Sequence, residues 1–355
     1  METDVLPPLV GLDPDEIRQA LDLHPSFRGL QVFQWIAKGA SSFDEMTNLS
    51  MADRECFAKK ACLYSSSVTQ TQRDPDGTVK LQIELKDGCC VETVLLTDRD
   101  GRKTACVSCQ AGCGMACAFC QTGRLGLERN LSAGEIVEEF LYLEKAAGKL
   151  DNIVFMGMGE PLQNLDAIFK ATSVLTNKKG RALSSRRITL STCGLVKGIY
   201  ELADRESGSG ISIRLAVSLT TADAQLRERL MPVAKSNPLP ELKKAISYYT
   251  EKTGKRVTLE AALLGGINTN RESADALKDF ASGLDVYINL IPWNPVPGLE
   301  FTTPSASECS RFLKMLEGAG LNAGLRTRRG SSISGACGQL GRTLKPSSRT
   351  TGTSN

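Results

Sequence analysis

The sequence is poor in histidine, in net charge and in long apolar runs. It contains a single histidine, His24, in 355 residues, so histidine is a poor candidate for a metal ligand. No run of about 18 or more apolar residues occurs, which excludes a transmembrane helix. The net charge is only +3, and this balance does not by itself indicate a nucleic-acid partner.

The beginning of the chain also lacks the features of a targeting segment. Its first 30 residues are rich in Asp and Glu, whereas signal and transit peptides begin with basic residues. This composition predicts a cytoplasmic protein, while an organellar location stays open.

Cysteine, in contrast, is abundant. The chain has 12 cysteines and no secretion signal, which indicates reduced thiols in a cytosol-like compartment rather than a disulfide framework. Hydrophobic residues make up 41% and charged residues 23% of the sequence, as in an ordinary globular protein. A chain of this length can form one large α/β domain and a small accessory domain.

Three of these cysteines lie close together, in the stretch GCGMACAFCQTG. Cys113, Cys117 and Cys120 have the spacing C-x3-C-x2-C. A four-iron, four-sulfur cluster held by three cysteines keeps one iron open to a substrate or cofactor. A structural zinc site takes a fourth protein ligand, and Cys109 lies just upstream. The spacing favours iron–sulfur over a zinc knuckle and leaves both open.

The periodicity predicts an α/β protein in four parts. Residues 1–62 are expected to form a helical accessory domain, with Asp13 or Asp15 starting its first helix. Residues 63–98 alternate as strands do, and an Asp87–Gly88 turn indicates a β-hairpin extension.

Residues 99–342 are expected to form the core domain. From Cys113 onward, strands alternate with helices, which predicts parallel β/α units and a partial, six-stranded (β/α)6 barrel. One of these helices has a capping box, Ser132 with Glu135. Residues 343–355 are rich in Ser, Thr and Arg and are expected to be disordered.

Two further features carry weaker chemical information. The stretch MGMGEP follows a strand, and its Glu160 could accept hydrogen bonds from the amino group of S-adenosylmethionine, although a tight turn explains it equally well. Cys106 and Cys337 lie outside the triplet and could each be a buried small hydrophobe. The glycines flanking Cys337 instead indicate a loop that is able to enter an active site.

Taken together, the motifs resemble those of the radical S-adenosylmethionine RNA adenine-C2 methyltransferases, the RlmN family, over almost the whole chain. The matching stretches are FRGLQVFQWIAKG, DEMTNLS, VETV, CVSCQAGCGMACAFCQTG, NIVFMGMGEPLQN, RRITLSTCGLVKGI, LAVSLTTAD, RLMPV, INLIPWNPVPG and RG followed by ACGQL. The related Cfr enzymes, which methylate adenine C8, are the nearest alternative.

The resemblance implies a role for each matching residue. Cys113, Cys117 and Cys120 would hold a [4Fe-4S] cluster. The residues implied in binding S-adenosylmethionine are Gly159, Glu160, Ser191, Ser218, Leu219, Thr220 and Asn294. Two molecules of this cofactor would be used per turnover.

The implied chemistry uses two cysteines and one carboxylate. Cys337 would be methylated on sulfur and, after hydrogen abstraction by a 5′-deoxyadenosyl radical, would add to C2 of adenine. Cys106 would then release the product by forming a disulfide with Cys337. Glu92, in VETV, corresponds to the proposed proton acceptor.

The implied partners are ribosomal or transfer RNA and an electron donor such as flavodoxin or ferredoxin, with no membrane and a monomeric chain. Two groups of basic residues could bind phosphates. They are Lys178, Lys179, Arg181, Arg186 and Arg187, and Arg326, Arg328 and Arg329.

The sequence also departs from the family pattern. Thr220 stands where histidine is usual, and Ser332 where an aspartate is usual. Ala261, Thr269 and Cys109 are smaller departures. A different class of function therefore stays open: an RNA-binding protein with a structural metal knuckle and lost catalysis.

Overall fold

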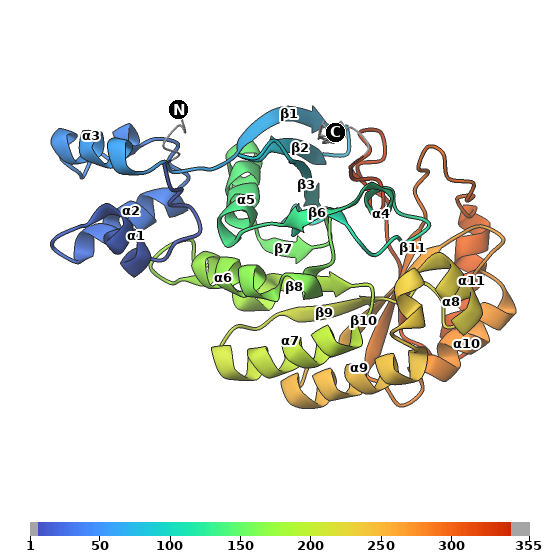
Figure 1. Cartoon of the computed structure of the whole chain (residues 1–355). Helices are drawn as coiled ribbons and strands as arrows, with labels where there is room; N and C mark the ends of the chain where they lie inside the picture. Colours follow the sequence, from blue (N-terminus) through green and yellow to red (C-terminus); the bar gives the residue numbers. More distant parts are fainter. Residues whose placement is uncertain (1–5, 342–355) are drawn as a thin grey trace, which may run out of the picture.

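A group of N-terminal helices lies beside a curved sheet that has its own covering helices (Figure 1). This computed structural model describes residues 6–341. The tail that was expected to be disordered, 343–355, lies outside the described residues.

The N-terminal group contains α1 (Pro14–Leu21), α2 (Phe27–Ala37), the 3-10 turn η1 (Phe43–Glu45) and α3 (Met51–Lys60). Asp13 begins α1 through a capping box, in which its carboxylate accepts from the backbone N–H of Glu16 at 3.0 Å. Lys170 on α6 (Leu165–Thr176) donates to the same carboxylate at 3.0 Å. The start of α1 is therefore joined to the rest of the protein.

Ten strands form one open sheet in the order β1-β2-β3-β4-β7-β8-β9-β10-β11-β12. The first part is antiparallel and contains β1 (Ser67–Arg73), β2 (Val79–Glu84), β3 (Cys90–Thr97) and β4 (Lys103–Val107). From β4 onward the pairing is parallel, through β7 (Asn152–Phe155), β8 (Ile188–Thr192), β9 (Arg214–Ser218), β10 (Val257–Leu263), β11 (Val286–Pro292) and β12 (Ala323–Leu325).

Helices connect the parallel strands and cover the outside of the sheet (Figure 1). Besides α6 they are α5 (Ala133–Ala147), α7 (Val196–Ser209), α8 (Ala224–Leu230), α9 (Leu239–Thr253), α10 (Arg271–Ala281) and α11 (Ala306–Gly318). The expected capping box at Ser132 and Glu135 begins α5. Because the strands are parallel, the loops at their carboxyl ends meet at one edge, where such folds place their chemistry.

A small second sheet interrupts the connection between β4 and α5. It consists of β5 (Gln110–Cys113) and β6 (Gly126–Asn130), with α4 (Gln121–Leu125) between them. The cysteine triplet belongs to this excursion, which begins just after the carboxyl end of β4.

The predicted fold class is confirmed: the helical accessory part, the β2–β3 hairpin with its Asp87–Gly88 turn, and the partial barrel are all present. The six predicted parallel strands correspond to β7 to β12, and β4 adds a seventh that the sequence pattern did not reveal. The barrel is open, since β1 and β12 form the two edges of the sheet.

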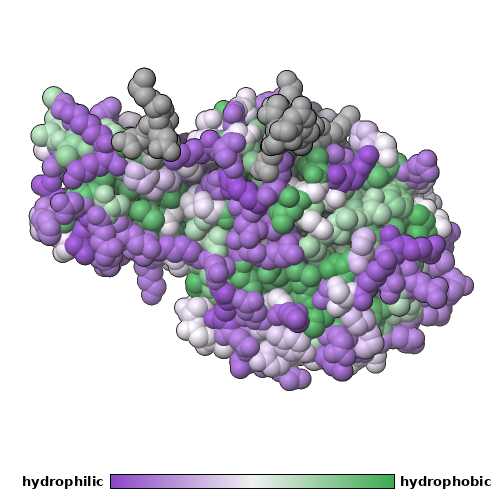
Figure 2. Space-filling view, in the orientation of Figure 1, coloured by the Kyte–Doolittle hydropathy of each residue, from purple (hydrophilic) through white to green (hydrophobic). Residues whose placement is uncertain are grey.

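Hydrophilic residues dominate the visible surface, and hydrophobic ones gather mainly over the sheet in the middle of the view (Figure 2). None of the helices in the described part of the chain is long and apolar enough to span a membrane.

Candidate active site

The cysteine triplet lies on a loop that is held firmly from two sides. Cys113 ends β5, and Cys120 immediately precedes α4. The backbone N–H of Ala118 donates to the carbonyl of Leu230 at 2.8 Å, and the indole N–H of Trp293 donates to the carbonyl of Phe119 at 2.9 Å. The loop is therefore fixed against the ends of α8 and β11.

The three cysteines line one cavity of about 190 Å³ at the carboxyl edge of the parallel sheet. The other predicted site residues on its wall are Gly159, Glu160, Ser191, Ser218, Thr220, Asn294 and Cys337. Leu219 is fully buried and is not part of this wall. Residues spread over more than two hundred positions of the chain thus meet around one space.

The chemistry of the donor set fits an iron–sulfur cluster, because three thiols border one cavity and thiolates are the ligands that such clusters take. Burial raises the pKa of the Cys113 thiol to about 11 and also raises the pKa values of Cys117 and Cys120. Among residues 6–341, no group of three or more His, Cys, Asp or Glu side chains is arranged to hold a single metal ion.

Gly159 and Glu160 form a turn that packs tightly on β5. A Cβ atom at Gly159, where φ is +105°, would lie 2.6 Å from Cβ of Gln110. The buried carboxylate of Glu160 accepts from the backbone N–H groups of Cys193 at 2.8 Å and Leu162 at 3.0 Å. Burial raises the pKa of Glu160. These residues shape the cavity wall even before any ligand binds.

Asn294 offers a binding atom that no described residue uses. Its amide nitrogen donates to the carbonyl of Cys337 at 3.2 Å, while its Oδ1 is buried and has no hydrogen-bond partner among the described residues. A buried acceptor without a donor costs about 1–3 kcal/mol. A ligand with an N–H or O–H group, such as S-adenosylmethionine, would satisfy it. Ser191 and Ser218 add two hydroxyls 3.4 Å apart on the same wall.

Thr220 has a left-handed backbone, with φ at +62°. A β-branched residue is strained in this region, whereas histidine and asparagine are enriched there. The strain persists because neighbours hold the backbone: its N–H donates to the carbonyl of Glu260 at 3.1 Å, and its carbonyl accepts from Asn268 at 3.0 Å. The departure from histidine thus carries a conformational cost as well as the loss of an imidazole.

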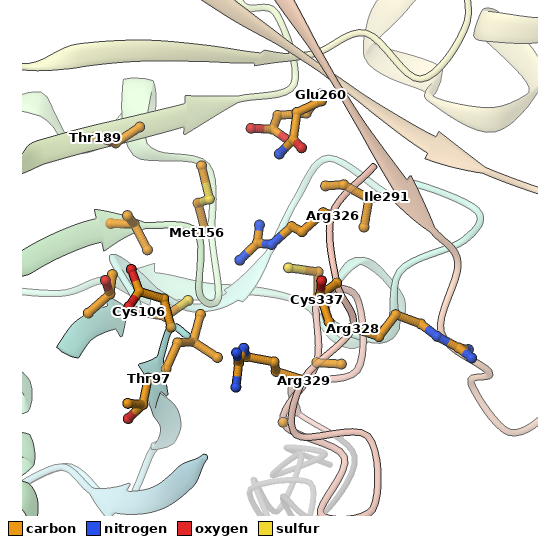
Figure 3. A pocket seen from close by; sticks show the side chains of 18 of the residues that line it. Thr97, Cys106, Met156, Thr189, Glu260, Ile291, Arg326, Arg328, Arg329 and Cys337 are labelled. Atoms are coloured by element: carbon orange, nitrogen blue, oxygen red, sulfur yellow. The ribbon is translucent and has the colours of Figure 1, made fainter. Parts of the chain in front are cut away.

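A second hollow of about 780 Å³ joins this cavity along the inner face of the sheet. Both spaces share Met156, Glu260, Ile291, Asn294, Arg326 and Cys337 as lining residues. Cys106, on β4, lines the second hollow, and its sulfur and that of Cys337 point into it from opposite sides (Figure 3). The structure therefore brings the two predicted reactive cysteines into one space.

Arg326 lies between these two cysteines in Figure 3. Burial and the nearby Cys337 together raise the pKa of Cys106 to about 12, although the Arg326 guanidinium opposes this effect. The electrostatic attraction of Cys337 raises the pKa of Arg326. From the sequence, Arg326 was grouped with Arg328 and Arg329 as basic residues that could bind phosphates. Nothing in the local sequence pattern indicates that it lines the site.

Glu260 is a second site residue that sequence reasoning missed. It is buried on β10, lines both spaces and accepts from Asn289 at 2.7 Å. Burial raises its pKa. A lone acid in the middle of the apolar strand VTLEAAL was the available signal.

The Cys337 segment is anchored to the cluster loop. The backbone N–H of Gln121 donates to the carbonyl of Gly338 at 2.8 Å, and the hydroxyl of Thr122 donates to the carbonyl of Leu340 at 2.8 Å. Both donors follow Cys120 directly, so the position of Cys337 depends on the same helix that begins at the last cluster cysteine.

Glu92 lies behind this segment and lines neither space. Its carboxylate pairs with Lys80 at 2.9 Å, and both side chains are almost fully buried. It also accepts from the backbone N–H of Gly341 at 2.6 Å, while Lys80 donates to the carbonyl of Ser334 at 3.5 Å. The ion pair therefore holds both ends of the Cys337 segment.

The other residues that depart from the family pattern form hydrogen bonds with nearby residues. The hydroxyl of Ser332 donates to Asp74 at 2.5 Å, so a carboxylate from the turn between β1 and β2 occupies the place next to this residue. Thr269 bonds to Glu308 on α11. Cys109 is buried outside the cavity wall and donates to the carbonyl of Met158 at 3.6 Å.

Known proteins share these features. Residues 107–280 match the Radical SAM superfamily, and residues 9–63 match the ribosomal RNA large subunit methyltransferase N-terminal domain. A Treponema denticola relative, named a probable dual-specificity RNA methyltransferase RlmN, is 57% identical over 96% of this chain and 97% of its own length. A relative of the same name from Treponema pallidum is 54% identical over 94% of this chain and 97% of its own length. This chain belongs to the RlmN family of radical SAM methyltransferases.

The fold of a solved structure agrees with this membership. A radical SAM methyltransferase from Sphaerobacter thermophilus superposes with a TM-score of 0.89 at 39% identity, covering 94% of this chain and 99% of that one. The resemblance drawn from the sequence motifs is therefore confirmed. Membership in the RlmN family implies an iron–sulfur cluster and S-adenosylmethionine, and the cavity offers the thiols and the unsatisfied Asn294 oxygen that would hold them.

Replacing Lys80 by Met should destabilise the protein, because it leaves a buried carboxylate without its cation. We expect the free energy of unfolding to fall by about 3–5 kcal/mol, measured by urea unfolding. Lys86→Met, at an exposed position nearby, is the control. The double variant Lys80→Met/Glu92→Gln should recover part of the loss. Equal effects of Lys80→Met and Lys86→Met would contradict the anchoring role.

Replacing Thr220 by Asn should stabilise the protein, because asparagine tolerates the left-handed backbone better. We expect a gain of about 1 kcal/mol in the free energy of unfolding, measured by the same method. Thr221→Asn is the matched control, since Thr221 is equally buried but is not in the left-handed region. If Thr220→Asn lowered the free energy of unfolding as much as Thr221→Asn does, Thr220 would not be strained.

Proposed function

We propose that this chain methylates C2 of adenine in ribosomal RNA, transfer RNA or both, through a methyl group carried on Cys337. The observation that carries the proposal is the shared hollow of Cys106 and Cys337, which joins the cavity of the cysteine triplet. The printed names of the relatives, RNA methyltransferases of dual specificity, support RNA as the substrate.

Adenine C2 requires this kind of chemistry. The carbon is not nucleophilic, so an ordinary polar methyl transfer has no lone pair to use. A [4Fe-4S] cluster on Cys113, Cys117 and Cys120, with S-adenosylmethionine, would supply one-electron chemistry that yields a 5′-deoxyadenosyl radical.

The two reactive cysteines would have different roles: Cys337 carries the methyl group and Cys106 releases the product. Cys337 would lose its thiol proton and take a methyl group from one S-adenosylmethionine. A second S-adenosylmethionine would supply the 5′-deoxyadenosyl radical, which takes a hydrogen atom from the S-methyl group of Cys337. The carbon radical that remains on this group adds to C2 of adenine. The adduct would then lose the C2 proton to Glu92 and one electron to the oxidised cluster. The Cys106 thiolate would attack the Cys337 sulfur, so that the sulfur–carbon bond breaks, a disulfide forms and the carbon takes up a proton.

Proton acceptance at C2 is the role we propose for Glu92, as the resemblance implies. Because Glu92 is bonded to Lys80 and to the backbone of Gly341, it would reach the reacting base only when the Cys337 segment shifts. The carboxylate of Glu92 would then first hold the Cys337 segment and, at a later stage, accept the C2 proton.

For RNA binding we propose the N-terminal helices and the basic groups. A groove of about 390 Å³ lies between the end of α2 and α5 and is lined by Lys38, Lys145, Lys149 and Arg181. The lining of the larger hollow includes Arg99, Arg102, Arg328 and Arg329, of which Arg102 is paired with Asp98 and Asp100. The target adenosine would have to be unpaired or extruded to enter, because C2 lies in the minor groove of a helix.

The remaining assignments are also proposals: division into residues 1–62, 63–98 and 99–342, a cytoplasmic monomer, and an electron donor such as flavodoxin or ferredoxin. The printed names of relatives that act on RNA support the cytoplasmic assignment.

Nucleoside mass spectrometry on RNA from cells that lack the gene tests the function. We expect 2-methyladenosine to disappear and to return with the wild-type gene but not with Cys337→Ala. Cys106→Ala should accumulate a covalent protein–RNA adduct, whereas Cys56→Ala, at an exposed cysteine, should behave as wild type. Unchanged 2-methyladenosine would refute the proposal, and 8-methyladenosine would indicate the Cfr type of reaction.

Reversing the charge of Arg186 and Arg187 should weaken RNA binding. Both are exposed in the 3-10 turn η3 (Ser185–Arg187), which leads into β8, where Thr189 lines the larger hollow. We expect the salt dependence of RNA affinity to fall by about one counter-ion for each phosphate that is no longer neutralised. Charge reversal at Lys244 and Lys252 on α9 is the control, and equal effects of both pairs would count against a specific role.

A further inference from the structure

Arg227 is the largest side chain among the fully buried residues of the described chain. It lies on α8, and its guanidinium donates to the carbonyls of Cys193 at 2.9 Å and Asn237 at 3.5 Å. Its Nε has no hydrogen-bond partner among the residues that the structure describes. No carboxylate of residues 6–341 lies within ion-pair distance of it, since every ion pair in that part of the chain involves other cations.

An isolated buried cation is costly. Removing a guanidinium from water costs several kcal/mol, and two carbonyl dipoles replace only part of its hydration. Burial accordingly lowers the pKa of Arg227. A fold that retains such a group requires either a compensating anion close by or hydrogen bonds from the guanidinium that stabilise the structure.

The anion can come from the cluster loop. The last residue of α8, Leu230, accepts through its carbonyl from Ala118, which lies between Cys117 and Cys120. Arg227 interacts electrostatically with the thiols of Cys193 and Cys117, both of which line the cluster cavity, and this attraction favours the thiolate of Cys117. The helix that carries the cation is therefore fixed to the loop that carries the thiols.

The opposite side of the guanidinium is equally closely packed. A Cβ atom at Gly194, where φ is +97°, would approach Nη2 of Arg227 to 3.0 Å. The turn after β8 thus leaves room for the arginine and holds it at the back of the cavity wall, where Cys193 also lies.

We propose that Arg227 is the fixed counter-charge of the iron–sulfur cluster and raises its reduction potential. This inference rests on the cluster assigned under the proposed function. On reduction, one electron from a low-potential donor enters the cluster, no bond is broken, and the net negative charge grows by one. A fixed cation stabilises the more negative, reduced form more strongly than the oxidised form.

The test is an anaerobic redox titration of the reconstituted full-length protein, followed by electron paramagnetic resonance. Arg227→Gln removes the charge and keeps a donor for the Cys193 carbonyl, while Arg227→Lys keeps a charge. Arg229→Gln removes an exposed charge from the same helix and is the matched control. Iron content and the visible spectrum are recorded for every variant.

We expect the equilibrium constant for reduction to fall on the order of tenfold in Arg227→Gln, equivalent to about 59 mV for a one-electron couple. Arg227→Lys should retain most of the wild-type potential, and Arg229→Gln all of it. An iron-loaded Arg227→Gln with unchanged potential would overturn the inference. Wild-type protein that binds no iron would instead overturn the proposed function.

A second measurement covers the case in which Arg227→Gln loses its cluster. Thermal unfolding of the cluster-free proteins is compared under reducing, anaerobic conditions. If the arginine serves the cluster, the cluster-free Arg227→Gln should be at least as stable as cluster-free wild type, because an unpaired buried charge has been removed. A large loss of stability in the cluster-free form would show that Arg227 is structural, and would overturn the inference.

Discussion

The parallel pairing of β4 with β7 is the constraint on which the rest of the site depends. In its register Cys106 lies opposite Val154, and Val107 opposite Phe155. Because side chains alternate between the faces of a strand, a slip by one residue would turn Cys106 away from the inner hollow. The same strand joins the antiparallel extension to the parallel sheet and leads directly into the cysteine loop, so one pairing sets the positions of both.

The Cys337 segment closes the site from the other end of the sequence. It is held by Gln121 and Thr122 next to the cluster loop, and by the Lys80–Glu92 pair from the extension. Lys80 is buried for this reason: it lies on the face of β2 opposite Val79, Leu81 and Ile83 and is covered by the C-terminal segment, where it donates to the carbonyl of Ser334. The hairpin extension is therefore part of the catalytic architecture.

The sequence allowed prediction of those features that are determined locally. The helix start at Asp13, the capping box at Ser132 and the Asp87–Gly88 turn involve residues a few positions apart, and the cysteine triplet lies within one loop. Strand β4 was missed because it lies directly before the cysteine motif, where the sequence was interpreted only as a metal-binding loop. Charges inside the fold were also not predicted, since the half-buried Arg326 and the fully buried Arg227 look like solvated cations until residues far apart in the chain are brought together. Family resemblance supplied the roles of Cys106 and Cys337, but it did not supply the arginine between them.

The scarcity of histidine has a consequence for proton handling. The single histidine lies in the exposed N-terminal part, and Thr220 occupies the position where the family usually has an imidazole, so the described site has no group whose ordinary pKa is near neutral. Burial raises the pKa of Glu160 and of Glu260, which moves both carboxyls toward the range in which they can exchange protons near neutral pH.

Burial also keeps Cys106 protonated in the resting site, and a thiol in that state is a poor nucleophile. Arg326 is the cation that opposes this effect, because it favours the thiolate of Cys106, and it borders Glu260 as well. Charge in this site is therefore controlled by burial and by fixed arginines instead of by a titrating imidazole.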